Sequence, residues 1–106
     1  MKIGMMIETK EPEKAWNAFR FGVASLKKGH EVKAFLMGEA VECEDAQDEK
    51  YNVLEQMKLF DVNGGEIIAC GTCLKSRQKD GNDLCPFSTM NDLVELVESS
   101  DKIISF

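Results

Sequence analysis

Short, nearly continuous apolar runs alternate with amphipathic helical patterns along the whole of this sequence. The runs cover Lys2–Ile7, Val32–Met37 and Glu66–Ala69. Strands with apolar residues at nearly every position are buried on both faces, as is typical of parallel sheets. Parallel strands need a crossover connection, usually a helix, so the alternation predicts a mostly parallel sheet with helices on both faces. We therefore expect a three-layer α/β/α domain.

Three stretches between these runs carry the three- and four-residue spacing of helices. The first follows Pro12 and stops at Gly29, the second stops at Asn63-Gly64-Gly65, and the third starts near a capping box at Thr89. Their apolar positions are Trp16, Phe19, Val23 and Leu26, then Val53, Leu54, Met57 and Phe60, then Met90, Leu93, Val94 and Val97. Phe21 points away from the first stripe and is expected to be covered by the fold or to anchor a subunit interface.

The remaining segments are less regular. Glu39–Lys50 is acidic and polar, which predicts a loop or an irregular helix. Leu74–Gln78 is expected to form a short helix, and Lys102–Phe106 a closing strand. No linker or repeat interrupts the chain, so residues 1–106 are expected to form a single domain.

Composition excludes several classes of function. The chain has 106 residues, enough for one core, with 43% hydrophobic and 30% charged residues. A net charge of -6 without a basic patch argues against a nucleic-acid partner. The apolar start meets Glu8 too early for a signal peptide or a membrane span, so we expect a cytoplasmic protein.

Four cysteines suggest thiol chemistry rather than structural disulfides in such a protein. Cys43, Cys70, Cys73 and Cys85 all fall in segments that follow predicted strands. Loops at the carboxyl ends of parallel strands converge on one edge of the sheet, where function usually lies. Cysteine also packs as a small hydrophobic residue, and we expect that role for Cys43 but leave it open for Cys85.

Cys70 is the main candidate for a reactive thiol. It lies where a buried strand meets a helix, and first-turn amides there stabilise a thiolate and lower its pKa. Gly71 leaves the backbone open to close approach, Thr72 offers a hydroxyl group, and Lys75 and Arg77 add positive charge. Cys73 follows one helical turn later, within potential disulfide reach.

Other chemistries find less support in the residues. The first strand is followed by Glu8-Thr9-Lys10-Glu11, whose carboxylates disfavour a flavin or nucleotide phosphate, so no cofactor is expected. His30, the only histidine, falls at the opposite edge from the cysteines, which disfavours a Cys-His relay. A zinc site built from Cys70, Cys73 and Cys85 would lack a nearby fourth ligand.

The sequence resembles the DsrE/DsrF-like sulfur-relay family over essentially its whole length. The resemblance rests on Cys70-x-x-Cys73-x-x-x-Arg77 after the third strand, the helix entry Ser88-Thr89-Met90, and the ending Asp101–Phe106. It implies a compact domain of flavodoxin-like topology that assembles into homotrimers or hexamers. It also implies a reactive cysteine at Cys70, followed by an arginine at Arg77, and sulfur carried as a cysteine persulfide between donor and acceptor proteins.

The leading hypothesis from the sequence is therefore a sulfur carrier or sulfurtransferase. In it Cys70 accepts sulfur, Cys73 is a second thiol, and Gly71, Thr72, Arg77 and Cys85 support the site. Two alternatives stay open: a dithiol–disulfide redox protein that uses Cys70 and Cys73, and a non-catalytic binding subunit of a sulfur-relay complex. A third, with less support, is metal binding.

Overall fold

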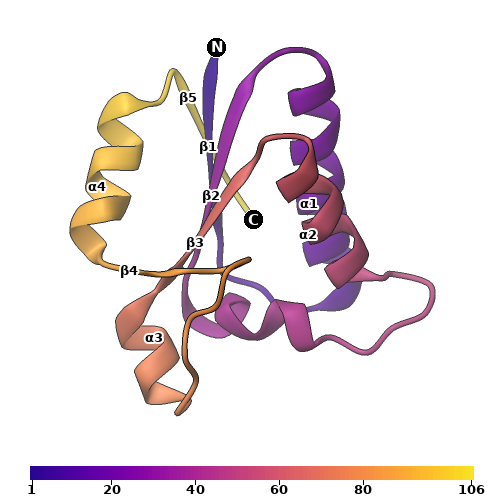
Figure 1. The fold of residues 1–106 in the computed structure, drawn as a ribbon, viewed down its shortest axis with the longest axis vertical. Coiled ribbons are helices and arrows are strands. Elements are labelled where there is room, and N and C mark those ends of the chain that lie inside the picture. Colours follow the sequence, from indigo (N-terminus) through magenta and orange to yellow (C-terminus); the bar gives the residue numbers. More distant parts are fainter.

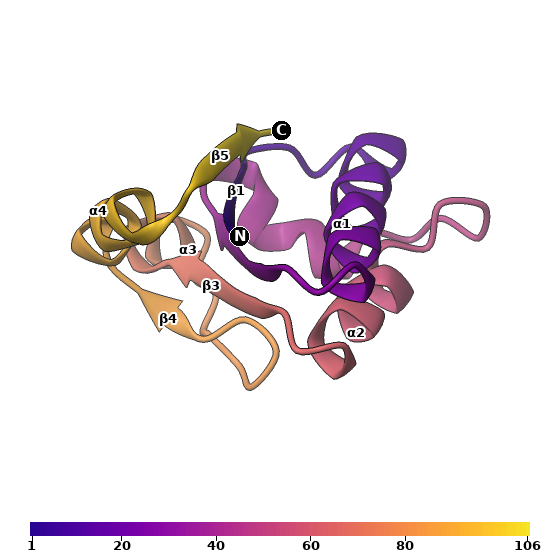
Figure 2. The same cartoon turned by 90° about the horizontal axis from the view of Figure 1, so that it is seen from above.

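The protein forms one twisted sheet with helices on both sides (Figures 1 and 2). This computed structural model describes residues 1–106. The strands are β1 (Lys2–Ile7), β2 (Glu31–Leu36), β3 (Glu66–Cys70), β4 (Phe87–Ser88) and β5 (Lys102–Ser105). All neighbouring pairs are parallel, in the order β4-β3-β2-β1-β5. The expected α/β architecture is confirmed.

The helices follow the periodicity of the sequence. They are α1 (Pro12–Lys27), the 3₁₀ helix η1 (Gly38–Asp45), α2 (Val53–Val62), α3 (Gly71–Ser76) and α4 (Met90–Ser99). Helices α1 and α2 lie on one side of the sheet and α4 on the other, with α3 below α4 at the end of β3 (Figures 1 and 2). None of these helices has both the length and the apolar character needed to cross a membrane.

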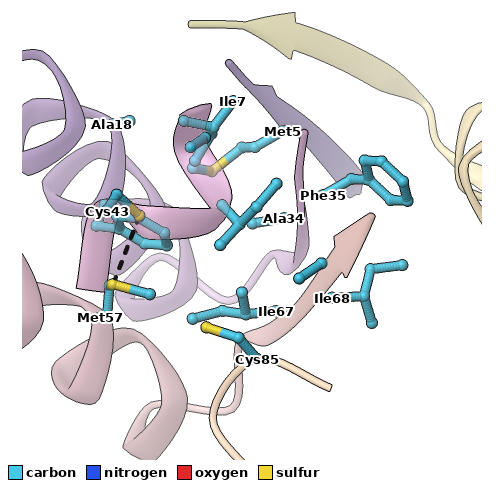
Figure 3. Close-up of a cluster of buried hydrophobic side chains, with 14 of the residues drawn as sticks. Met5, Ile7, Ala18, Ala34, Phe35, Cys43, Met57, Ile67, Ile68 and Cys85 are labelled. Carbon is cyan, nitrogen blue, oxygen red and sulfur yellow. Dashed lines mark hydrogen bonds between the residues drawn. The ribbon is translucent and has the colours of Figure 1, made fainter. Parts of the chain in front are cut away.

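Alternation along the strands divides the core between the two faces. Ala34 and Ile67 point to one side and Phe35 and Ile68 to the other (Figure 3). On one side of the sheet α1 and α2 pack closely together: a Cβ added to Gly22 of α1 would come within 2.6 Å of the Phe60 ring of α2. This close approach of the two helices explains why α1 has a glycine in its interior despite the cost to helix stability.

Two local features differ from the sequence-based expectation. Helix α3 begins at Gly71 instead of Leu74, so Cys70 is its N-cap residue and Cys73 lies in its first turn. Strand β4 was not predicted, because its two residues carry no periodic signal. It exists because the chain after Pro86 pairs with the edge of β3, with Ser88 opposite Cys70.

Helix α4 starts with a full capping box, which fixes where the chain leaves β4. The Asp92 N–H donates to Thr89 Oγ1, and the Thr89 N–H donates to the Asp92 carboxylate at 2.8 Å. The two reciprocal bonds stabilise the first turn of the helix.

We expect Thr89→Ala to lower the free energy of unfolding by about 1 kcal/mol, because the N-cap acceptor is lost. Urea unfolding followed by circular dichroism measures the change. Thr89→Ser keeps an acceptor oxygen and serves as the matched control. Equal stability of the alanine and serine variants would contradict the capping role.

Candidate functional site

Cys70 and Cys73 open into a shallow pocket at the carboxyl end of β3. Its volume is about 390 Å³, and it lies between α3, β4 and the start of α4. The lining residues are Cys70, Gly71, Thr72, Cys73, Lys75, Phe87, Ser88, Thr89 and Met90. The two cysteines that the sequence analysis singled out therefore share one pocket with Gly71 and Thr72.

The two thiols differ in burial and in their contacts. Cys70 is 4% exposed, whereas Cys73 is half-buried. Burial raises the pKa of the Cys73 thiol, and its contact with the Cys70 side chain raises it further. Cys73 therefore keeps its proton at neutral pH and can donate its S–H to the sulfur of Cys70.

A backbone amide from a neighbouring strand end also reaches this pair. The Gly38 N–H donates to Cys73 Sγ at 3.1 Å, which acts to lower the pKa of Cys73 against the two stronger effects. Gly38 follows β2 and has a φ of +58°, a conformation that favours glycine. Gly38 was not predicted as a site residue, although its position at the end of a predicted strand was a usable signal.

Gly71 allows an aromatic ring to pack closely in the pocket wall. A Cβ on this residue would lie 2.2 Å from Cζ of Phe87. The Phe87 ring therefore rests directly on the backbone of the first turn of α3, and the Lys75 ammonium lies 5.4 Å from the centre of that ring. The glycine therefore allows a close approach to the backbone of α3, and the group that approaches is the Phe87 ring of the protein itself.

Arg77 binds a carboxylate rather than a thiol. Its Nε donates to Glu42 Oε1 at 2.7 Å, and its Nη1 donates to the carbonyl oxygen of Cys73 at 3.2 Å. Its charge acts to lower the pKa of Cys73, as a minor effect. Arg77 thus ties the end of α3 to η1 more than it supplies an anion site.

Cys85 is buried away from the pocket, in a second cluster with Cys43. Both thiols are desolvated and close to the Glu44 carboxylate: burial, then Glu44, raises the pKa of Cys43 to about 12 and raises the pKa of Cys85 as well. The Cys43 thiol donates to Met57 Sδ at 3.8 Å (Figure 3). No three His, Cys, Asp or Glu side chains of residues 1–106 are grouped to hold a metal ion.

Glu44 is itself held by partners from the segment after α3. Lys79 Nζ donates to Glu44 Oε1, and Asn82 Nδ2 donates to both carboxylate oxygens of Glu44. Burial acts to lower the pKa of Lys79, but the bond to Glu44 and the nearby Asp45 charge leave this pKa raised. No sequence pattern indicated a role for Glu42, Glu44, Lys79 or Asn82, because their pairings join segments more than thirty residues apart.

A model of the DsrE/DsrF-like family matches residues 1–106. The chain belongs to the DsrE/DsrF-like family. It is 37% identical over 100 residues to Uncharacterized protein MK0008 of Methanopyrus kandleri, covering 89% of this chain and 83% of that protein. It is 34% identical over 100 residues to Uncharacterized protein MJ0989 of Methanocaldococcus jannaschii, covering 89% and 88%.

The fold of this DsrE/DsrF-like chain is also similar to a solved structure. The crystal structure of the YchN protein from E. coli superposes with a TM-score of 0.85, covering all of both chains at 20% identity. The resemblance inferred from the cysteine and arginine spacing is thus confirmed at the level of family and fold.

The four thiols are expected to react at very different rates with iodoacetamide. Cys73 is the most accessible, whereas Cys43 and Cys85 are buried and have raised pKa values. We expect alkylation of Cys43 and Cys85 in the native protein to be at least about a hundredfold slower than that of Cys73. Peptide mass mapping with time checks this, and labelling in urea, where all four thiols should react alike, is the control.

The buried thiols also predict a loss of stability at alkaline pH. The unfolded chain releases the Cys43 proton near the ordinary pKa of 9.0, but the folded protein keeps it until about pH 12. The free energy of unfolding should therefore fall by about 1.4 kcal/mol per pH unit in this range from Cys43 alone. The raised pKa of Cys85 acts in the same direction.

Urea unfolding at a series of pH values measures this slope. Cys43→Ala removes one titrating thiol and should make the slope shallower, even though it lowers stability at neutral pH. An unchanged slope in Cys43→Ala would show that Cys43 is not the group responsible.

Proposed function

We propose that this protein is a sulfur carrier that holds sulfane sulfur as a persulfide on Cys70. The observation that carries the proposal is the thiol pair in one open pocket, where Cys73 contacts Cys70 and accepts the N–H of Gly38. Membership of the DsrE/DsrF-like family supports it. The pocket exposes a reacting sulfur to a second protein, as passage of sulfur between thiols requires.

Sulfur uptake needs only thiol chemistry. The Cys70 thiolate attacks the outer sulfur of a donor persulfide, a new S–S bond forms, and the donor thiolate leaves. The thiol proton of Cys70 goes to solvent or to the departing donor. No net oxidation occurs, because one sulfur–sulfur bond replaces another.

Two routes of release are open to the persulfide. An acceptor thiolate can attack the outer sulfur and take it, which returns Cys70 as a thiolate. Alternatively, the Cys73 thiol gives up its proton and attacks the inner sulfur, a Cys70–Cys73 disulfide forms, and the outer sulfur leaves as hydrosulfide with the electron pair and that proton. The contact between the thiols favours the second route, and it equally favours the alternative of a dithiol–disulfide redox protein.

The same proposal includes donor and acceptor proteins as partners, a cytoplasmic location and a homotrimeric or hexameric assembly. Phe21 is 38% exposed and packs with Phe106 at a ring-centre distance of 6.1 Å. This partly covered aromatic pair is a candidate contact in such an assembly.

Sulfur loading is tested by incubation with polysulfide, followed by intact-mass analysis of the gel-filtered protein. We expect a gain of one sulfur atom that is abolished in Cys70→Ser. In Cys73→Ser the gain should persist longer than in the wild type, because release through an internal disulfide is removed. Cys85→Ala alters a cysteine outside the pocket and should load as the wild type does.

Three other outcomes would change or overturn the proposed function as a sulfur carrier on Cys70. A loss of two hydrogens without any sulfur gain indicates the redox alternative. Sulfur gain that persists in Cys70→Ser assigns the nucleophile to another cysteine, and no gain in the wild type overturns sulfur transport.

A further inference from the structure

Exposed apolar side chains of α4 form a stripe that begins at the thiol pocket. Met90, Val94 and Val97 are spaced four and three residues apart, so they share one face of α4. Each is about half exposed, and so is Phe87 on β4. We call Phe87, Met90, Val94 and Val97 the α4 stripe. Phe87 and Met90 also line the pocket of Cys70 and Cys73, so stripe and pocket are continuous.

The α4 stripe is separate from the apolar side chains by which α4 packs against the sheet. Leu93 and Leu96 of the same helix are 6% and 5% exposed and attach α4 to the sheet. Helix α4 therefore carries apolar surface on a second face that no other part of the chain covers. A contiguous exposed apolar patch of this kind marks an interaction site.

Negative charge borders the stripe on its solvent side. Glu95 and Glu98 are exposed, and neither takes part in an ion pair or a hydrogen bond. By helical spacing Glu98 lies next to Val94 on the side away from the buried face. Lys75 lies beside Phe87 at the pocket end of the stripe, but along α4 the apolar side chains border unpaired carboxylates. This part of the surface complements an apolar segment flanked by lysine or arginine.

Pairing of two copies of this chain through their own stripes fits the surface less well. If two copies joined through their stripes about a two-fold axis, Glu95 and Glu98 of each would face the same residues of the other. Juxtaposed like charges destabilise an interface. Four half-exposed side chains also present less than the roughly 800 Å² per partner that a stable interface buries, which suits a transient contact.

We propose that the α4 stripe docks a basic amphipathic segment of the protein that accepts sulfur from the thiol pair. This inference rests on the proposed sulfur-carrier function. Docking brings the acceptor thiolate to the pocket mouth, where it attacks the outer sulfur of the Cys70 persulfide. The bond between that sulfur and Cys70 breaks, Cys70 leaves as a thiolate, and the acceptor becomes the persulfide without net oxidation.

Two synthetic peptides of one design serve as probes. Both carry one cysteine and leucines that share a helical face, and they differ only in flanking lysines or flanking glutamates. The polysulfide-loaded protein is freed of excess reagent, and peptide persulfide is followed by mass spectrometry. We expect the basic peptide to receive sulfur at least about tenfold faster, and this preference to disappear in about 1 M salt.

Variants separate the contributions of charge and apolar contact. Glu95→Lys/Glu98→Lys should slow transfer to the basic peptide by about tenfold or more and favour the acidic one. Val94→Ser/Val97→Ser should slow transfer to both peptides. Glu49→Lys/Asp61→Lys makes the same change in net charge in α2 and the loop before it, away from α4, and should leave the preference unchanged.

Transfer of sulfur to free cysteine needs no docking, so it measures whether the protein carries transferable sulfur. If the protein passes sulfur to free cysteine but shows no preference between the peptides, the docking proposal is wrong and the carrier function stands. If no sulfur is loaded, both fail. If Val94→Ser/Val97→Ser converts an oligomer into monomers in sedimentation analysis, the stripe joins copies of this chain and the docking proposal is overturned.

Discussion

The parallel register between β2 and β3 brings together residues that are far apart in the sequence. Leu36 lies opposite Ala69, so Gly38 and Cys70 follow the ends of two neighbouring strands. Only in this arrangement does the Gly38 amide reach the sulfur of Cys73. A slip by one residue would turn the buried side chains of β3 to the opposite face of the sheet. The packing of the core therefore also sets the geometry of the thiol pair.

Ion pairs between η1 and the segment after α3 hold this edge of the sheet closed. Arg77 binds Glu42, and Lys79 binds Glu44, whose side chain is only 12% exposed. Removing one member of a shielded pair leaves the other charge desolvated, so such pairs constrain the chain strongly even where they add little stability. The constrained segment leads directly into β4, whose Phe87 closes the pocket against Gly71.

Elements with a regular period could be read from the sequence, whereas contacts between irregular segments could not. The apolar runs gave β1, β2 and β3, and the spacing from Trp16 to Leu26 gave α1, because burial on a sheet or a helix imposes a period. Strand β4 has two residues and was not predicted, whereas η1, which has no apolar period, was predicted only as a loop or an irregular helix. The cysteine pair of the pocket was identified by its local spacing. Gly38 could have been considered because it follows a predicted strand, but its contact with Cys73 depends on tertiary structure that no local pattern encodes. The same holds for the cluster of Glu44 with Lys79.

Burial and neighbouring charge give the four cysteines of this chain two different chemical characters. Cys43 and Cys85 lie beside Glu44 in the interior, where desolvation and a nearby carboxylate both oppose ionisation. Cys70 and Cys73 lie at the carboxyl end of β3 and line a pocket, and the Gly38 amide donates to Cys73. A thiolate can react with a second molecule only where that molecule reaches it. Because the apolar stripe of α4 starts at that same pocket, the surface that recognises a partner and the sulfur that reacts with it are joined by Phe87 and Met90.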